Sequence, residues 1–153
     1  MEASSDRIER SVLIKAPRAR VWRALADAGE FGAWFGVNLQ GQSFIAGQPI
    51  RGHITHPGYE HIQFNALVDR VQPQTQLAFR WHPFAIDPAL DYSQEEPTAV
   101  VFTLADAPGG TLLTVVESGF SKVPAQRREE AFRMNSGGWD AQMENIVEHI
   151  GAS

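Results

Sequence analysis

Four polar residues in the central and later parts of the chain could form an internal cluster that recognises a ligand: Arg51, His53, Arg80 and Glu117. A guanidinium group pairs well with a carboxylate, and a few converging polar groups in an apolar pocket can orient a ligand's carboxylate or hydroxyl. All four residues also fall on expected strands. The alternative interpretation is therefore a set of exposed cross-strand pairs on a solvated face.

A second group of polar residues surrounds an expected hairpin tip at Pro57–Tyr59. His56 and His61 would lie across from each other there, with Glu60 beside them. Two histidines and a carboxylate are suitable metal ligands. Side chains at hairpin tips are usually solvated, however, and the spacing indicates no further ligand. We therefore expect no metal site.

Motifs of the common catalytic and nucleotide-binding sites are missing from the sequence. It contains no Ser-His-Asp order, P-loop, G-x-G-x-x-G or paired-carboxylate motif. It also contains no cysteine, which excludes disulfides, thiol nucleophiles and cysteine-ligated metals. We therefore expect no cofactor.

The composition is that of one ordinary globular domain. The chain has 153 residues, 43% of them hydrophobic and 20% charged, with a formal net charge of −5. This charge argues against nucleic-acid binding, which requires a basic patch. Residues 1–6 are expected to form a disordered tail, and residues 7–151 to form the domain.

The first residues, Met1–Asp6, contain no apolar stretch, so no signal peptide is expected. No apolar run approaches about 20 residues, the length that a transmembrane helix needs. These features favour a cytoplasmic location without membrane insertion.

Strand and helix patterns follow one another clearly along the chain. The N-terminal part predicts a strand over Arg7–Lys15, a helix over Pro17–Ala28 and a short helical turn at Phe31–Gly36. Gly and Pro clusters then separate alternating apolar segments, as in an antiparallel meander. The expected strands are Val37–Phe44, Ile50–His56, His61–Gln72, Gln76–Pro83, Thr98–Ala105 and Thr111–Phe120.

Phe84–Pro97 is a long, acidic segment punctuated by proline, and we interpret it as a mobile loop between two strands. Whether it acts as a lid stays open at this point. The last thirty or so residues are typical of one long amphipathic helix, because apolar residues recur at three- and four-residue steps up to Ile150.

Two adjacent glycines, Gly137 and Gly138, lie in the middle of this long helix. Each costs a helix about 1 kcal/mol relative to alanine. They could form a hinge at a pocket mouth, or they could mark a place where the sheet, Trp22 or Trp34 packs too closely to admit a Cβ. We favour the close approach, which predicts that Gly138→Leu destabilises the protein.

The order of these elements resembles that of the START-like (SRPBCC, helix-grip) superfamily, and most of all its subgroup named after an activator of the heat-shock-protein-ninety ATPase. The resemblance covers about Arg7 to Ile150. It consists of a strand-to-helix entry, a short "F…W" helix, an "L-x-F-x-W" strand, a "G-T-x-L-x-x-x-E" strand and a "G-W" pair. These motifs lie at Val12–Pro17 with Val21–Leu25, Phe31–Trp34, Leu77–Trp81, Gly110–Glu117 and Gly138-Trp139.

This resemblance implies an α+β helix-grip fold, in which a curved antiparallel sheet of about six to seven strands wraps around the long C-terminal helix. It also implies an apolar pocket between the sheet and that helix. The alternative for each aromatic residue is that it fills the core. The candidate lining residues are Trp34, Phe35, Phe44, Phe64, Phe79, Trp81, Phe102, Met134, Trp139 and Met143.

The leading functional hypothesis is non-enzymatic binding of a small hydrophobic molecule, such as a lipid, sterol-like or aromatic compound, with a role related to stress. One alternative is a cyclase/aromatase-like or hydrolase enzyme that uses His53, His82 or Glu117 as acid or base. The other is a co-chaperone-like interaction module whose partner is a heat-shock ATPase. Fold-level likeness alone does not decide among these functions.

Overall fold

The computed structural model describes residues 6–87 and 89–151. Within these residues the chain forms six strands, three α-helices and one turn of 3-10 helix. In chain order they are β1 (Arg7–Ile14), α1 (Arg18–Ala26), α2 (Ala28–Phe35), β2 (Pro49–His53), β3 (Gln63–Gln72), β4 (Gln76–Trp81), β5 (Thr98–Ala107), β6 (Gly110–Ser118), η2 (Phe120–Lys122) and α3 (Ala125–Gly151).

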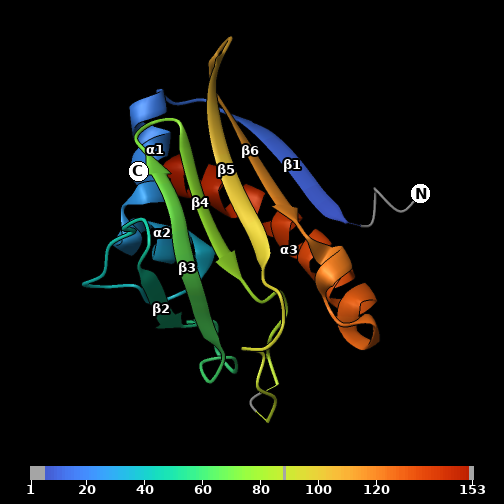
Figure 1. The fold of residues 1–153 in the computed structure, drawn as a ribbon. Coiled ribbons are helices and arrows are strands. Elements are labelled where there is room, and N and C mark those ends of the chain that lie inside the picture. Colours follow the sequence, from blue (N-terminus) through green and yellow to red (C-terminus); the bar gives the residue numbers. More distant parts are fainter. Residues whose placement is uncertain (1–5, 88, 152–153) are drawn as a thin grey trace.

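All six strands belong to one antiparallel sheet with the order β1-β6-β5-β4-β3-β2. The strands from β2 to β6 form a meander, and β1 pairs with β6 at the far edge. The sheet curves around α3, which crosses behind it, while α1 and α2 lie beside the end of that helix (Figure 1). The expected α+β helix-grip fold is confirmed, with six strands.

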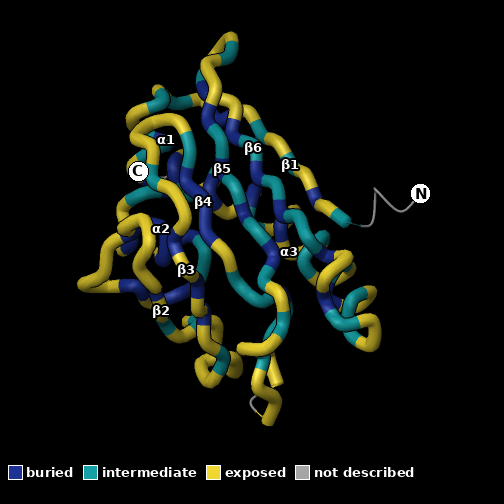
Figure 2. Tube along the Cα trace, viewed as in Figure 1, coloured by how far each residue is buried: buried dark blue, intermediate teal, exposed yellow. Residues whose placement is uncertain are grey.

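Alternation along the strands determines which side chains face the helices. Leu113, Val115 and Glu117 of β6 are fully buried, whereas the two residues between them are half-buried. The same alternation is visible as dark blue positions on the neighbouring strands (Figure 2). Phe79 and Phe102 on β4 and β5 fill the middle of this face. A buried Phe of this kind contributes about 3–5 kcal/mol to stability relative to alanine.

The two short helices are joined to α3 through Glu30 of α2. Its carboxylate accepts from Arg20 at 2.5 Å, and Nε2 of His149 lies 3.2 Å away. Burial alone would raise the pKa of Glu30, but Arg20 and His149 outweigh it and hold the pKa below its ordinary value. Glu30 thereby links the first turn of α2 to α1 and to the last turn of α3.

The expected strand at Val37–Phe44 does not form. Only Val37 makes an isolated bridge, to Ile54, and the chain then turns at Gly41, whose φ is +79°. The apolar alternation that predicted the strand is real, since Val37, Leu39 and Phe44 are buried. These side chains fill the core from a loop, so alternation alone does not establish strand pairing.

Asp6, which was expected to belong to a disordered tail, forms hydrogen bonds with residues 119–121. Residues 1–5 lie outside the described residues, but Asp6 belongs to the fold. Its carbonyl oxygen accepts from the backbone N–H groups of Gly119 and Phe120 at 3.1 and 3.2 Å, and its carboxylate accepts from that of Ser121 at 2.9 Å. The bonds to Ser121 hold the pKa of Asp6 below its ordinary value.

The interpretation of the glycine pair in α3 as a close approach is wrong. A Cβ added at Gly137 or Gly138 would meet nothing within 4 Å, and both residues are exposed in a continuous helix. The close approaches lie elsewhere: a Cβ at Gly52 would come within 2.0 Å of the carbonyl oxygen of Asn38. The steric reason for expecting Gly138→Leu to destabilise the protein is therefore absent.

Two glycines of α2 allow a direct test of such close approaches. A Cβ at Gly32 would lie 2.2 Å from the carbonyl oxygen of Val37, whereas one at Gly29 would meet nothing within 4 Å. We expect Gly32→Ala to lower the free energy of unfolding by about 1–3 kcal/mol through overpacking. Gly29→Ala, the control, should be neutral or slightly stabilising. Urea unfolding measures both changes, and equal midpoints would contradict the packing of α2 described above.

Candidate ligand-binding site

A cavity with a volume of about 540 Å³ lies at the end of the sheet where β4 leads into the 82–97 loop. Figure 1 shows this loop and the β2–β3 connection at the same end of the molecule. Aromatic and aliphatic side chains from both segments, from α2 and from the sheet form most of its wall. They are Phe35, Ile54, Ile62, Phe64, Trp81, Phe84, Ala85, Ile86, Leu90 and Tyr92.

A smaller cavity of about 150 Å³ lies next to it, between the sheet and α3. Phe35, Trp81 and Asn135 line both cavities. The smaller one is completed by three residues of α3: Gly138, Trp139 and Gln142. The two cavities therefore form neighbouring parts of one candidate site.

Each shared wall residue occupies the end or the inner face of an element. Phe35 is the last residue of α2, which Gly36 ends with a left-handed conformation (φ +94°). The side chain of Gln142 on α3 donates to the backbone carbonyl of Phe35 at 2.9 Å. Trp81 is the last residue of β4. The site is thus formed where α2 and β4 end against the middle of α3.

Behind these wall residues lies a buried carboxylate, Glu117, which occupies an inward-facing position of β6 and has no exposed surface. Its Oε2 accepts from Nε1 of Trp81 at 2.7 Å and from the hydroxyl of Thr98 at 2.5 Å. Its Oε1 accepts from Nδ2 of Asn135 at 2.9 Å and from Nε1 of Trp139 at 2.9 Å.

Indole and amide N–H groups only donate hydrogen bonds, so they require acceptor oxygens on Glu117. Both carboxylate oxygens are occupied by such donors, an arrangement that suits the ionised form. No Lys or Arg of the described residues forms an ion pair with it. The site is therefore built around a negative charge that only neutral groups solvate.

The 82–97 loop, which supplies much of the large cavity's wall, is attached to α3 by Arg127. The guanidinium binds the carboxylate of Glu95 at 2.5 and 3.0 Å and donates to the carbonyl of Pro83 at 2.7 Å. It also lies 4.7 Å from the ring centre of Tyr92. These contacts hold both ends of the loop, while Leu90 within it stays 56% exposed.

Charged side chains at the large cavity are few. Among the described residues that line it, no Lys or Arg is present, and Asp91 is the carboxylate. The backbone N–H of Ser93, with its hydroxyl, holds the pKa of Asp91 below its ordinary value. The described lining of this cavity therefore offers no Lys or Arg as an ionic partner to an anionic group.

The residues expected to line the pocket divide into two groups. Phe35, Phe64, Trp81 and Trp139 line the cavities. The others do not: they are buried in the core, except Met134, which is 43% exposed on α3. Trp34, for example, donates from its indole to the carbonyl of Ala24 at 2.8 Å. The core residues are Trp34, Phe44, Phe79, Phe102 and Met143.

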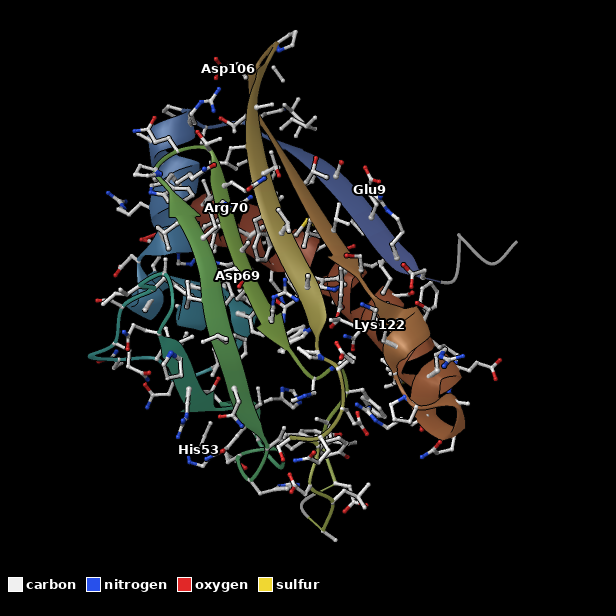
Figure 3. The ribbon with its side chains drawn as sticks, viewed as in Figure 1. Glu9, His53, Asp69, Arg70, Asp106 and Lys122 are labelled. Atoms are coloured by element: carbon white, nitrogen blue, oxygen red, sulfur yellow. The ribbon has the colours of Figure 1, made fainter. Side chains whose placement is uncertain are left out.

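The expected polar cluster does not form. Arg51, His53 and Arg80 point to the solvated side of the sheet, and Arg80 pairs there with Asp69 at 2.8 Å. Only Glu117 faces the helix. Successive side chains of a strand alternate between faces, and the three residues have the outward phase of their strands. Figure 3 shows His53 at the outer edge of the sheet beside β2.

The histidines considered as an acid or base and as metal ligands lie in different surroundings. His82 lies beyond the end of β4, lines the large cavity and contacts the carbonyl of Glu95 at 3.0 Å through Nε2. His56 and His61 are exposed. In the part of the chain that the structure describes, no group of three or more His, Asp or Glu residues is arranged to hold a metal ion.

Sequence reasoning missed Asn135 and Gln142, the two polar residues that α3 contributes. Asn135 lies four residues before Trp139, so the two side chains share one helix face and reach the same carboxylate oxygen. This four-residue spacing was the feature of the sequence that could have identified Asn135. No sequence pattern could have identified the cavity-lining residues of the 82–97 loop, because a loop lacks the periodicity that would place its side chains.

Replacing Glu117 by Gln tests the role of the buried carboxylate. The amide would turn an NH₂ group toward two of the four donors, leaving a buried donor without an acceptor. We expect the free energy of unfolding to fall by about 1–3 kcal/mol. The control is Glu144→Gln, an exposed position on α3, which should change it by less than about 0.5 kcal/mol. Equal urea midpoints for the two variants would show that the carboxylate is dispensable.

Replacing Arg127 by Gln should loosen the 82–97 loop. The change removes the ion pair with Glu95 and the cation–π contact with Tyr92, which together contribute about 1–3 kcal/mol locally. We expect faster limited proteolysis within 84–97, measured by mass spectrometry of the fragments. The exposed Arg133→Gln on the same helix should leave the cleavage rate unchanged. Equal rates for both variants would mean that Arg127 does not hold the loop.

Solved structures share this fold. Protein MLL2253 from Mesorhizobium loti is 26% identical, with a TM-score of 0.72 over 96% of this chain and 98% of that one. DynU16, encoded in the dynemicin biosynthetic locus, is 25% identical, with a TM-score of 0.72. The match covers 95% of this chain and 47% of DynU16, so this chain spans about half of DynU16. Protein NE0264 from Nitrosomonas europaea shows the same fold at 17% identity and a TM-score of 0.74.

No curated protein matches the sequence closely enough to count as a relative. Among the residues that the structure describes, no helix combines the length and the apolar character needed to cross a bilayer.

The sequence pattern of one family, described as activator of Hsp90 ATPase homolog 1-like protein, matches residues 15–151. Its fold is typically a ligand-binding fold. The two helices, the sheet and the long C-terminal helix that form the site all lie within the matched region, and the chain belongs to this family of activator of Hsp90 ATPase homolog 1-like proteins.

Proposed function

We propose that the protein binds a small hydrophobic molecule, such as a lipid, sterol-like or aromatic compound, without changing it chemically. The cavity of about 540 Å³ at the end of the sheet carries this proposal. Pockets for small molecules commonly measure about 300–1,000 Å³ and have mostly apolar walls with a few polar groups. The combination of Phe35, Phe64 and Trp81 with His82 and Asn135 meets that description.

Burial of apolar ligand surface would provide most of the affinity, at about 25 cal/mol per Å². The rings at the inner end of the cavity contact one another, with Phe35, Phe64 and Trp81 centred 5.4 to 6.1 Å apart. They form a rigid wall that loses little conformational entropy when a ligand docks. A flat or chain-like apolar ligand is therefore well matched to this end.

The 82–97 loop acts as the lid in this proposal. Its residues supply the outer wall of the cavity, and Ile86 and Leu90 remain 41% and 56% exposed. An exposed apolar side chain at a cavity mouth gains burial when a ligand or the loop itself covers it. The loop base is anchored by Arg127, so opening would be confined to the segment between the anchors.

The buried position of Glu117 argues against the enzymatic alternative for that residue. Its side chain has no exposed surface, and both oxygens already accept two hydrogen bonds. A general acid or base must reach the proton that it transfers. Glu117 is thus better suited to organising the wall residues than to reacting with a substrate.

Two alanines of the loop provide a matched test of the binding proposal. Ala85 lines the large cavity, whereas the exposed Ala89 does not. We expect Ala85→Trp to fill the cavity and weaken the binding of a neutral apolar dye, N-phenyl-1-naphthylamine, at least about tenfold. Ala89→Trp adds the same side chain to the same loop and should leave the affinity within about twofold.

Fluorescence titration measures the dye affinity, and native mass spectrometry of freshly purified protein shows any ligand that is retained from the cell. Dye binding that is equally strong in both tryptophan variants would place it outside the cavity and contradict the proposal. Failure of the wild-type protein to bind the dye or to retain any small molecule would contradict it as well.

A further inference from the structure

We infer that the smaller cavity beside Gly138 is an aromatic cage for an ammonium group, and that the ligand is an organic cation with an apolar body. This inference rests on the proposed function, because the body of the same ligand would occupy the large cavity. The cage consists of Phe35, Trp81 and Trp139, with Asn135 and Gly138 completing its wall.

The three rings of the cage surround one another closely. Their centres are 6.1 Å apart for Phe35 and Trp81, 6.2 Å for Phe35 and Trp139, and 5.9 Å for the two tryptophans. The planes differ by 30° to 64°. Cations bind over aromatic faces within about 6 Å of a ring centre, best over tryptophan, and several rings at different angles can enclose a methylated ammonium group.

Glu117 supplies the charge that makes the cage selective for a cation. The indole N–H groups of both cage tryptophans donate to its carboxylate, Trp81 at 2.7 Å and Trp139 at 2.9 Å. The negative charge therefore lies at the N–H edge of both rings. A hydrogen bond to an anion polarises the indole and makes its ring face more negative. Ring and carboxylate thus attract the same positive charge.

A buried charge without an ionic partner is costly in a low-dielectric interior. In the described part of the chain, the donors to Glu117 are neutral and no Lys or Arg pairs with it. A ligand cation in the cage would be the first positive charge near this carboxylate. The binding of such a ligand should therefore stabilise the folded protein as well.

The walls of both cavities discriminate against anions. No Lys or Arg of the described residues lines either cavity, and Asp91 adds a negative charge to the large one. Arg127 of α3, which holds the 82–97 loop, is already paired with Glu95. A fatty-acid carboxylate would lose its hydration without gaining a Lys or Arg partner, whereas an ammonium group would gain the aromatic faces of the cage.

Size sets the kind of ammonium group. A volume of about 150 Å³ accommodates a small methylated head, and Gly138 leaves it open because no side chain projects from that position. The cage adjoins the large cavity through Phe35, Trp81 and Asn135. An apolar chain or ring system attached to the ammonium group would extend past these shared residues toward the larger space.

A charged and an uncharged probe of the same shape test the inference. Choline and 3,3-dimethylbutan-1-ol differ in that a carbon replaces the quaternary nitrogen. We expect choline to bind the wild-type protein at least about tenfold more tightly in a calorimetric or fluorescence titration. Equal or weaker binding of choline would overturn the cage.

Three variants locate the effect. Gly138→Leu should fill the cage and abolish choline binding, whereas Gly137→Leu, on the next position of the same helix, should retain it; both should fold, since neither position is crowded. Phe35→Leu should weaken choline binding several-fold and change the affinity for the uncharged alcohol by less than about twofold. Choline binding that survives Gly138→Leu, or equal losses of both probes in Phe35→Leu, would overturn the assignment.

The outcomes for the cage and for the proposed function are distinguishable. If the apolar dye binds in the large cavity but choline has no advantage over its uncharged analogue, the cage is wrong and hydrophobic binding stands. If neither the dye nor the alcohol binds, the proposed function fails, and the inference that rests on it fails too.

Discussion

The interaction on which the rest of the structure depends is the burial of the Glu117 carboxylate between the sheet and α3. Its four hydrogen-bond donors come from three elements: Trp81 on β4, Thr98 at the start of β5, and Asn135 and Trp139 on α3. A carboxylate in an apolar interior is tolerated only when its oxygens are fully hydrogen-bonded. The separation of helix and sheet at this point is therefore specified by polar geometry rather than by side-chain volume.

Because of this constraint, one end of the interior is filled by side chains and the other end contains cavities. At one end Phe31, Phe79 and Phe102 pack edge to face and fill the space completely. At the other end the tryptophans that hold Glu117 are oriented by their N–H groups, and the neighbouring helix position is a glycine. Rings fixed by hydrogen bonds cannot collapse into the space beside Gly138. The cavities thus follow from the way the carboxylate is solvated, and the loop only closes them.

Much of the fold was predictable from the sequence because it depends on local periodicity. Alternation predicted β4 and β6, and the order of the motifs predicted that a long helix would cross the sheet. Alternation also showed that Arg80 and Trp81 lie on opposite faces, but it did not show which face the helix covers. This is why Arg80 was wrongly grouped with Glu117. The segment after α2 failed for a related reason, since its apolar residues reach the core from a loop.

The candidate site was less predictable, because its properties arise where elements end. Phe35 and Trp81 are the last residues of α2 and β4, and the cavity's outer wall belongs to a loop without periodicity. The glycine pair was misread because a small residue has two opposite uses, to let backbones approach or to leave space open. Only the surroundings distinguish them, and here Gly32 and Gly52 serve the first use and Gly138 the second.

A buried carboxylate is an unusual way to support an apolar cavity, since hydrophobic residues of similar volume would often give equal or greater stability. Its retention is understandable if the charge has a use beyond holding the wall. Glu117 turns the indole N–H groups inward and presents the tryptophan faces to the cavity, so one group determines both the shape and the electrostatic potential of the site. We expect the same arrangement to favour an amine over a fatty acid. The negative charge of Glu117 attracts a cation, and the described lining of the cavities contains no Lys or Arg that would pair with a carboxylate.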